Sequence, residues 1–162
     1  NEKELFAPFG ADAKAAEKAY NAATSKDFPL LRDAVGRNEL FVGPARFVAQ
    51  TLSSQGDPVW EYRFSYVPFL ARVKVPAAPH GGETPFVFDY KKWFIVPLTP
   101  GDQKMAQKMS TYWTNFAKTG NPNSAGLPNW PSYHSSTDML MNFTENGPVA
   151  EADPWKQQLD LT

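Results

Sequence analysis

The chain has 162 residues, of which 42% are hydrophobic and 14% aromatic, so it can form a substantial core and is not expected to be disordered. Its 16 basic and 17 acidic residues give a formal net charge of -1 and are interspersed, which argues against nucleic acid or anionic lipid as a partner. The absence of cysteine excludes disulfides, thiolate metal sites and cysteine nucleophiles, and it leaves secreted and cytoplasmic locations both open.

The chain contains no apolar run near the roughly 18 to 20 residues that cross a bilayer, so no membrane span is expected. Its first residues, NEKELFAPFG, lack an initiating methionine and do not resemble a signal peptide. This beginning suggests a mature or truncated chain.

Two helices are predicted in the first part of the chain. The alanine-rich stretch ADAKAAEKAY favours a helix over about residues 11–20. A second helix is expected over 38–56, with Asn38 as its N-cap and Gly56 at its end. Its apolar side chains recur with a period of 3.6 residues, which predicts one buried face formed by Phe41, Ala45, Val48 and Leu52.

The stretch PVWEYRFSY, residues 58–66, predicts a strand. Its aromatic residues alternate with other residue types, which predicts one buried face formed by Trp60, Tyr62, Phe64 and Tyr66. The same rings could form a stacking platform for sugars or bases, but an aromatic stripe of period two is more often part of a core.

The clearest helix follows residue 99. Thr99 is expected to cap it, Pro100 to occupy its first position and Asp102 to complete a capping box, while Gly120 ends it. Its apolar stripe is Met105, Met109, Tyr112, Trp113 and Phe116.

A short strand over 138–143 and a last helical turn or two within 152–161 complete the elements. This order of helices and strands is typical of the terminal portion of an α/β layer architecture. Two strands some 70 residues apart would leave most sheet edges open, so the chain is interpreted as the end of something larger.

A proline-rich loop, VPAAPHGGETPFVF, places one of only two histidines between two prolines and a Gly-Gly pair. Because an unperturbed imidazole titrates near about pH 6.5, His80 is a candidate proton shuttle. Loops of this kind often carry chemistry, although a lone loop histidine is more often a surface residue. The second histidine, His134, lacks such a context and is interpreted as a surface residue.

Glu83 follows three residues after His80. His-x-x-Glu without a third ligand is a weak metal signal, so no metal or organic cofactor is expected. Glu83 is interpreted as a partly buried carboxylate that orders the loop, with a solvated side chain as the alternative. The glycosylation sequon at Asn142 falls in the predicted strand and is given little weight.

In α/β-hydrolases the catalytic serine lies in a G-x-S-x-G turn, and the acidic residue and histidine follow it in the chain. No serine of this chain has glycines at both required positions. If a triad is involved, this chain carries only its histidine.

Three stretches in order, APHGGETPFVF, MSTYWTNFAKTGNPN and LPNWPSY, resemble the C-terminal part of type-B carboxylesterases, the carboxylesterase/cholinesterase family of α/β-hydrolases. The resemblance begins at about Phe41. It implies that residues 1–162 are the C-terminal part of a single α/β-hydrolase domain, roughly its last third, with the nucleophile elbow upstream and absent. It also implies that His80 is the catalytic histidine and that Glu83 supports its loop.

One departure from the family is Ala77, where glycine is frequent, and the lack of cysteine resembles bacterial members more than animal ones. The expected function is hydrolysis of a small-molecule ester, with the remainder of the esterase chain as partner and with the fragment alone inactive. One alternative is a non-catalytic adhesion or partner-binding member of the same fold. Another is an autonomous carbohydrate-binding domain.

Overall fold

The computed structural model describes residues 1–90 and 96–162, and of Ala23 the backbone alone. These residues form two compact units. We call the first the helical unit; it consists of Asn1–Val59, Tyr133–Asp138 and Ala152–Thr162. We call the second the sheet unit; it consists of Trp60–Ser132 and Met139–Glu151.

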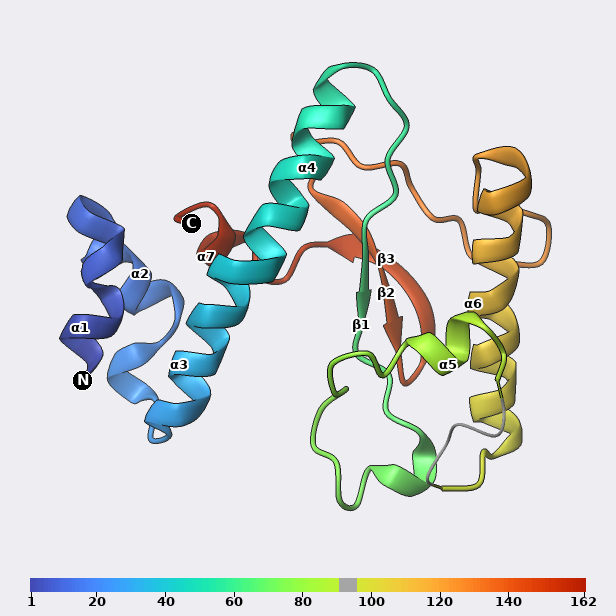
Figure 1. The fold of residues 1–162 in the computed structure, drawn as a ribbon, viewed down its shortest axis with the longest axis horizontal. Coiled ribbons are helices and arrows are strands. Elements are labelled where there is room, and N and C mark those ends of the chain that lie inside the picture. Colours follow the sequence, from blue (N-terminus) through green and yellow to red (C-terminus); the bar gives the residue numbers. More distant parts are fainter. Residues whose placement is uncertain (91–95) are drawn as a thin grey trace. The chain divides into compact units, whose positions relative to one another are not determined.

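The helical unit is built from short helices around a small core (Figure 1). The predicted helix at 11–20 is confirmed as α2, and the predicted last helical turn as α7. Its α-helices are α1 (Glu2–Phe6), α2 (Ala13–Ala19), α3 (Phe28–Arg37), α4 (Gly43–Ser54) and α7 (Lys156–Leu159), and 3-10 turns span Ala7–Asp12 and Ala22–Thr24. The buried side chains at its centre are Phe6, Ala16, Tyr20, Ala22, Leu31 and Val35.

The second predicted helix begins ten residues earlier than the sequence indicated. Asp27 caps α3, because its side chain accepts the Leu30 amide at 3.1 Å. Asn38 is therefore not an N-cap; it is fully buried within the continuing helix and donates its side-chain amide to the Tyr20 hydroxyl at 3.0 Å. A short π-helix, Asn38–Val42, joins α3 to α4 where Pro44 cannot donate a backbone hydrogen bond.

The apolar face predicted for this helix is exposed, not buried. Phe41 and Val48 are 65% and 53% accessible, and Ala45 and Leu52 are exposed as well. The buried residues of α4 are instead Arg46 and Ala49. The period of the sequence identified side chains that share a face, but most of their area remains accessible.

The sheet unit contains a three-stranded sheet in the order β1-β2-β3 (Figure 1). The strands are β1 (Tyr62–Phe64), β2 (Met139–Thr144) and β3 (Gly147–Ala152), and β1 runs parallel to β2. The predicted strand 58–66 is thus shorter than expected, although Glu61 and Ser65 also bond to β2 through their backbones. The strand predicted over 138–143 is confirmed as β2, and β3 was not predicted.

Two helices complete the sheet unit: α5 (Thr84–Val87) and α6 (Pro100–Thr119). The predicted start of α6 is confirmed, because Thr99 and Asp102 form a capping box and Pro100 follows the cap. Gly120 ends the helix in a left-handed conformation, with φ 72°. The core between α6, α5 and the sheet contains Tyr66, Phe86, Met105, Ala106, Met109, Tyr112, Trp130, Met141 and Phe143.

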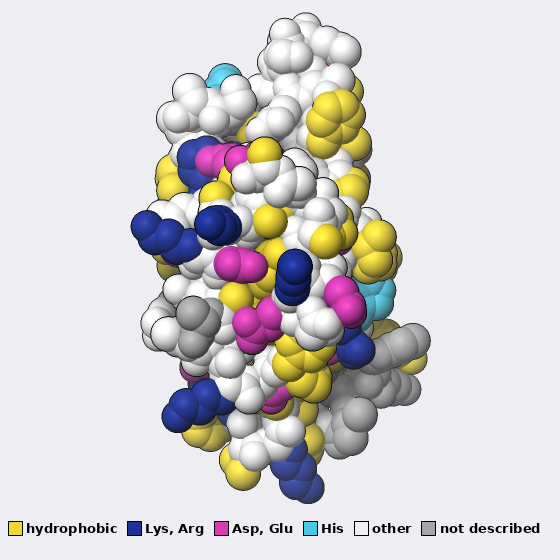
Figure 2. All heavy atoms as spheres, turned by 90° about the vertical axis from the view of Figure 1, so that its left-hand side faces the viewer, with side chains coloured by type: hydrophobic (Ala, Val, Ile, Leu, Met, Phe, Trp, Pro, Cys, Tyr) yellow, Lys and Arg dark blue, Asp and Glu magenta, His cyan; other side chains and the backbone are white. Residues whose placement is uncertain are grey.

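Charges of both signs are mixed on the surface. Figure 2 shows Lys and Arg side chains between Asp and Glu side chains on one face, rather than gathered by sign. Among the described helices, none is long and apolar enough to cross a membrane.

Candidate functional site

His80 lies in an exposed turn of the sheet unit, immediately before α5. Gly81 adopts a left-handed backbone conformation, with φ 72°, which glycine reaches at little cost. The Gly82 amide then donates to the Pro79 carbonyl at 3.0 Å, and the Thr84 amide donates to the Gly81 carbonyl at 3.2 Å. The Gly-Gly pair therefore closes a tight turn that presents the histidine at the surface.

The second glycine of the pair is required for steric reasons. A Cβ atom at Gly82 would lie 2.9 Å from the Pro79 carbonyl oxygen and 3.2 Å from its ring Cδ. Contacts this short force the neighbouring atoms to move. The close approach of the two backbone segments thus depends on the absence of a side chain at residue 82.

Helix α5 fastens this turn to the core. Phe86 is 1% accessible, and its ring lies 5.3 Å from Tyr66 and 5.4 Å from Phe64 between ring centroids. Such aromatic pairs add to the free energy of burying a ring. His80 therefore lies only six residues before Phe86, whose side chain is buried against the rings of Phe64 and Tyr66.

Glu83 lies between the histidine and this anchor. Its side chain is half-buried, and its backbone carbonyl accepts the amides of Phe86 and Val87 at 2.9 and 3.0 Å, which begins α5. Burial raises the pKa of Tyr62, and the negative charge of Glu83 raises it further. Glu83 therefore interacts electrostatically with the β1 tyrosine.

A buried carboxylate that sequence reasoning treated only as a helix cap has a larger role. Asp102 is fully buried and accepts hydrogen bonds from the Tyr66 hydroxyl at 2.6 Å and the Phe69 amide at 2.9 Å, in addition to two bonds from Thr99. Burial opposes its charge, but the hydrogen bonds hold the pKa of Asp102 below its usual value. No local pattern could reveal the contact with Tyr66, which is 36 residues away.

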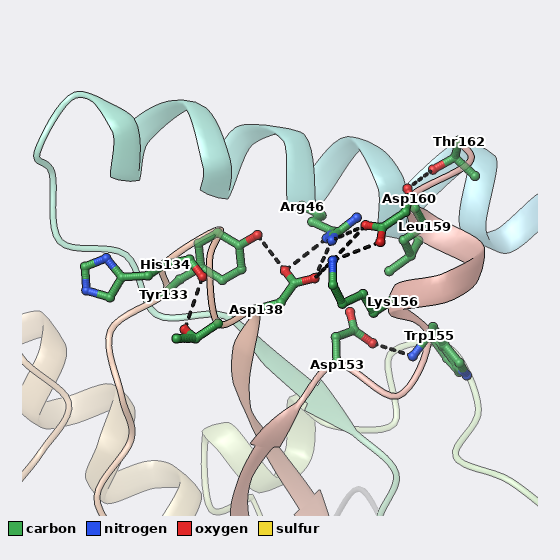
Figure 3. Close-up of polar contacts among 11 residues, drawn as sticks. Arg46, Tyr133, His134, Asp138, Asp153, Trp155, Lys156, Leu159, Asp160 and Thr162 are labelled. Atoms are coloured by element: carbon green, nitrogen blue, oxygen red, sulfur yellow. Dashed lines mark hydrogen bonds and ion pairs between the residues drawn. The ribbon is translucent and has the colours of Figure 1, made fainter.

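The helical unit has its own ionic cluster, in which Arg46 and Asp138 are buried and Lys156 and Asp160 are partly accessible (Figure 3). The Arg46 guanidinium bonds the Asp138 carboxylate through two nitrogens and also donates to Asp160 at 2.7 Å. Lys156 lies 2.9 Å from Asp160, and the Tyr133 hydroxyl donates to Asp138 at 2.7 Å. Because the partners satisfy one another, the cluster joins α4, α7 and the residues before β2 rather than offering a free reactive group.

The remaining candidates have structural explanations. His134 is exposed in a loop, as expected. Asn142 of the sequon is 7% accessible and donates to Glu151, so in this fold it is not presented for glycosylation. Among the described residues, no group of three His, Cys, Asp or Glu side chains could hold a metal ion.

The four aromatic residues of the predicted strand 58–66, which are Trp60, Tyr62, Phe64 and Tyr66, pack against other rings. Trp60 meets Phe116 of α6 edge-on at 5.7 Å, and Tyr62 meets Trp113 at 5.0 Å between ring centroids. Of the four, only Tyr66 is fully buried, and Tyr62 remains 40% accessible. These contacts are those of a core and do not favour a carbohydrate-stacking platform, but the prediction of a wholly buried aromatic face is wrong at Tyr62.

Comparison with known proteins gives consistent matches. Residues 13–161 match the model of the carboxylesterase family. Cocaine esterase of Homo sapiens is 38% identical over 109 residues, covering 64% of this chain and 19% of that protein. Carboxylesterase 5A of Canis lupus familiaris is 38% identical over 134 residues, covering 75% of this chain and 23% of that protein.

A solved structure is similar over almost the whole chain. The crystal structure of carboxylesterase EST55 of Geobacillus stearothermophilus at pH 6.2 gives a TM-score of 0.73 at 27% identity, covering 99% of this chain and 35% of that one. The chain therefore spans well under half the length of the relatives that it matches.

Proposed function

Because the chain belongs to the carboxylesterase family, we propose that it is the C-terminal part of a serine carboxylic-ester hydrolase in which His80 is the general acid and base. Its α/β-hydrolase architecture agrees with the fold expected from the sequence. The single observation that carries the proposal is the exposed His80, held by the tight Gly-Gly turn and by the buried anchor Phe86.

In the proposed reaction, His80 accepts the proton of a serine hydroxyl as the serine oxygen attacks the ester carbonyl carbon. The imidazolium then gives this proton to the departing alkoxide, which leaves as the alcohol. Water repeats the sequence: His80 takes its proton, hydroxide adds to the acyl-enzyme, and the serine leaves with the proton returned to it. The serine and the acidic triad member would come from residues upstream of this chain.

Two features support a role as part of a larger domain. The apolar face of α4 is exposed in this chain. Contiguous exposed apolar surface usually marks a contact site, so we infer that another part of the complete protein covers this face. The matched structure is also nearly three times as long as the segment matched. Glu83 is half-buried and its backbone carbonyl begins α5, and we propose that it orders the histidine turn.

The test is hydrolysis of a short-chain p-nitrophenyl ester by the complete esterase that contains this chain. His80→Ala should lower turnover by about 10³- to 10⁶-fold. The matched control is His134→Ala, which removes the other histidine and should leave turnover near normal. The 162-residue chain alone should be inactive.

Near-normal turnover in His80→Ala would refute the proposal. A complete protein that folds but hydrolyses no ester would instead favour the non-catalytic, partner-binding alternative.

A further inference from the structure

We propose that Asp102 is a positioning residue for His80, because its buried carboxylate fastens both ends of the segment that carries the histidine. The proposal rests on the proposed function of His80. The segment runs from Tyr66, two residues after β1, to Thr99, the N-cap of α6. Asp102 itself lies in the first turn of α6.

The two carboxylate oxygens serve the two ends of this segment separately. Oδ1 accepts the Tyr66 hydroxyl at 2.6 Å and the Phe69 amide at 2.9 Å, and both groups belong to the beginning of the segment. Oδ2 accepts the Thr99 amide at 2.7 Å and the Thr99 hydroxyl at 2.6 Å, at its end. One carboxylate thus closes a loop of about thirty residues.

Only the second set of bonds is needed to cap a helix. In the capping box of α1, the Glu4 carboxylate bonds Asn1 and both residues are exposed. Asp102 makes the equivalent bonds to Thr99 and adds two bonds to residues more than thirty positions away. The buried Oδ1, which accepts two hydrogen bonds from residues outside the cap, distinguishes this carboxylate from an ordinary cap.

A chain of contacts leads from Asp102 to the histidine turn. The hydroxyl of Tyr66 is held by Asp102, and the ring of Tyr66 packs edge-on against Phe86 at 5.3 Å. Phe86 is buried in α5, whose first amide bonds are accepted by Glu83, three residues after His80. Releasing Tyr66 from Asp102 would therefore loosen the surface on which the turn is anchored.

The chemistry explains why the residue must be a carboxylate. All four groups around it are donors, and a carboxylate presents acceptors on both oxygens. Asparagine has the same shape but one of its two positions is an NH₂ group, which would face donors. Asp102→Asn therefore disrupts one end of the segment without creating a cavity.

The first test uses NMR of the 162-residue chain, in which only two histidines contribute imidazole signals. In Asp102→Asn, the His80 signal should broaden or divide, while the His134 signal in the helical unit should not change. Hydrogen exchange of residues 67–90 should become about tenfold faster or more. Tyr66→Phe, which removes one bond and keeps the ring, should give a smaller effect of the same kind.

The matched control is Asp27→Asn, the same substitution at a helix cap in the helical unit. Its side chain accepts one amide, from Leu30, and contacts no part of the His80 segment among the bonds described. It should leave the His80 signal and the exchange of residues 67–90 unchanged. An effect equal to that of Asp102→Asn would show that general loss of stability, not positioning, is responsible.

The second test measures kinetics of the complete esterase well below its melting temperature, with active sites counted by a stoichiometric serine reagent. Asp102→Asn should lower kcat by about 10- to 100-fold with KM nearly unchanged, because a misplaced general base affects the chemical step. Unchanged kcat per active site would overturn the positioning role.

The two proposals fail separately. If His80→Ala retains turnover, the proposed function of His80 is wrong whatever Asp102 does. If Asp102→Asn and Tyr66→Phe both leave the His80 signal and the exchange of residues 67–90 unchanged, the role of Asp102 is wrong even when His80 is essential.

Discussion

The buried ion pair between Arg46 and Asp138 offers the sharpest test of the energetics (Figure 3). The two side chains are 6% and 0% accessible, so Arg46→Met leaves a carboxylate that water cannot reach. Breaking such a pair typically costs about 3–5 kcal/mol when the remaining charge has no compensation. Here Lys156 at 3.4 Å and the Tyr133 hydroxyl at 2.7 Å remain beside Asp138.

We therefore expect Arg46→Met to lower the free energy of unfolding of the helical unit by about 3 kcal/mol, at the lower end of that range. Asp138→Asn is compatible with the left-handed backbone at this position, where φ is 53°. Combining the two changes removes both charges, so the double variant should lose less than the sum of the single losses by at least about 1 kcal/mol.

The assay is urea unfolding of the 162-residue chain, followed by circular dichroism and fluorescence in parallel, because coincidence of the two probes tests for a single transition. Hydrogen exchange of α4 in the same urea series assigns the transition to the helical unit. The control is Arg32→Met: Arg32 pairs with Asp33 at 3.4 Å, with side chains 64% and 67% accessible, so the loss should be under about 0.5 kcal/mol. A loss below about 1 kcal/mol in Arg46→Met would refute the reasoning.

Three further outcomes are expected. Burial opposes the charge of Asp138, but its hydrogen bonds and the nearby cations lower its pKa. The stability that this provides is present above the ordinary pKa of about 3.9 and is lost as the pH falls through the lowered pKa. The urea concentration at the unfolding midpoint should therefore decrease as the pH is lowered below about 4, and it should decrease less in Arg46→Met. Gly82→Ala should speed hydrogen exchange in the histidine turn because of the 2.9 Å approach to Pro79, whereas Gly101→Ala, with its nearest contact at 3.7 Å, should not. Val48→Lys should change the melting temperature of the 162-residue chain little, since Val48 is 53% accessible, but should lower that of the complete esterase; equal tolerance in both would contradict burial of the apolar face of α4 by upstream residues.

Local signals in the sequence gave the correct elements where the interacting residues are neighbours. Thr99 and Asp102 lie three positions apart, so their capping box could be predicted from spacing alone. The bond between Asp102 and Tyr66 could not, because it depends on how distant segments pack. Likewise β3 has no alternating apolar pattern and contains Pro148, so its strand exists because the adjacent β2 provides a partner.

The apolar face of α4 shows a different limit. A period of 3.6 residues identifies side chains on one side of a helix, but it does not say which part of the protein covers them. The face predicted to be buried contains Phe41 and Val48, and both side chains remain largely accessible. The candidate site was accessible to sequence reasoning through His80 and Glu83, whereas the network that holds their segment was not.

The parallel pairing of β1 with β2 has a consequence for biosynthesis. Ser65 bonds Phe143, 78 residues later in the chain, so β1 has no partner on this edge until β2 has been synthesised. A ribosome releases the segment with His80 well before that point. Contacts this distant in sequence form slowly because closing the intervening chain costs entropy first. The packing partners of the histidine loop are therefore incomplete until β2 has been synthesised, and we expect nascent chains that stop before residue 139 to be readily cleaved by proteases within the loop.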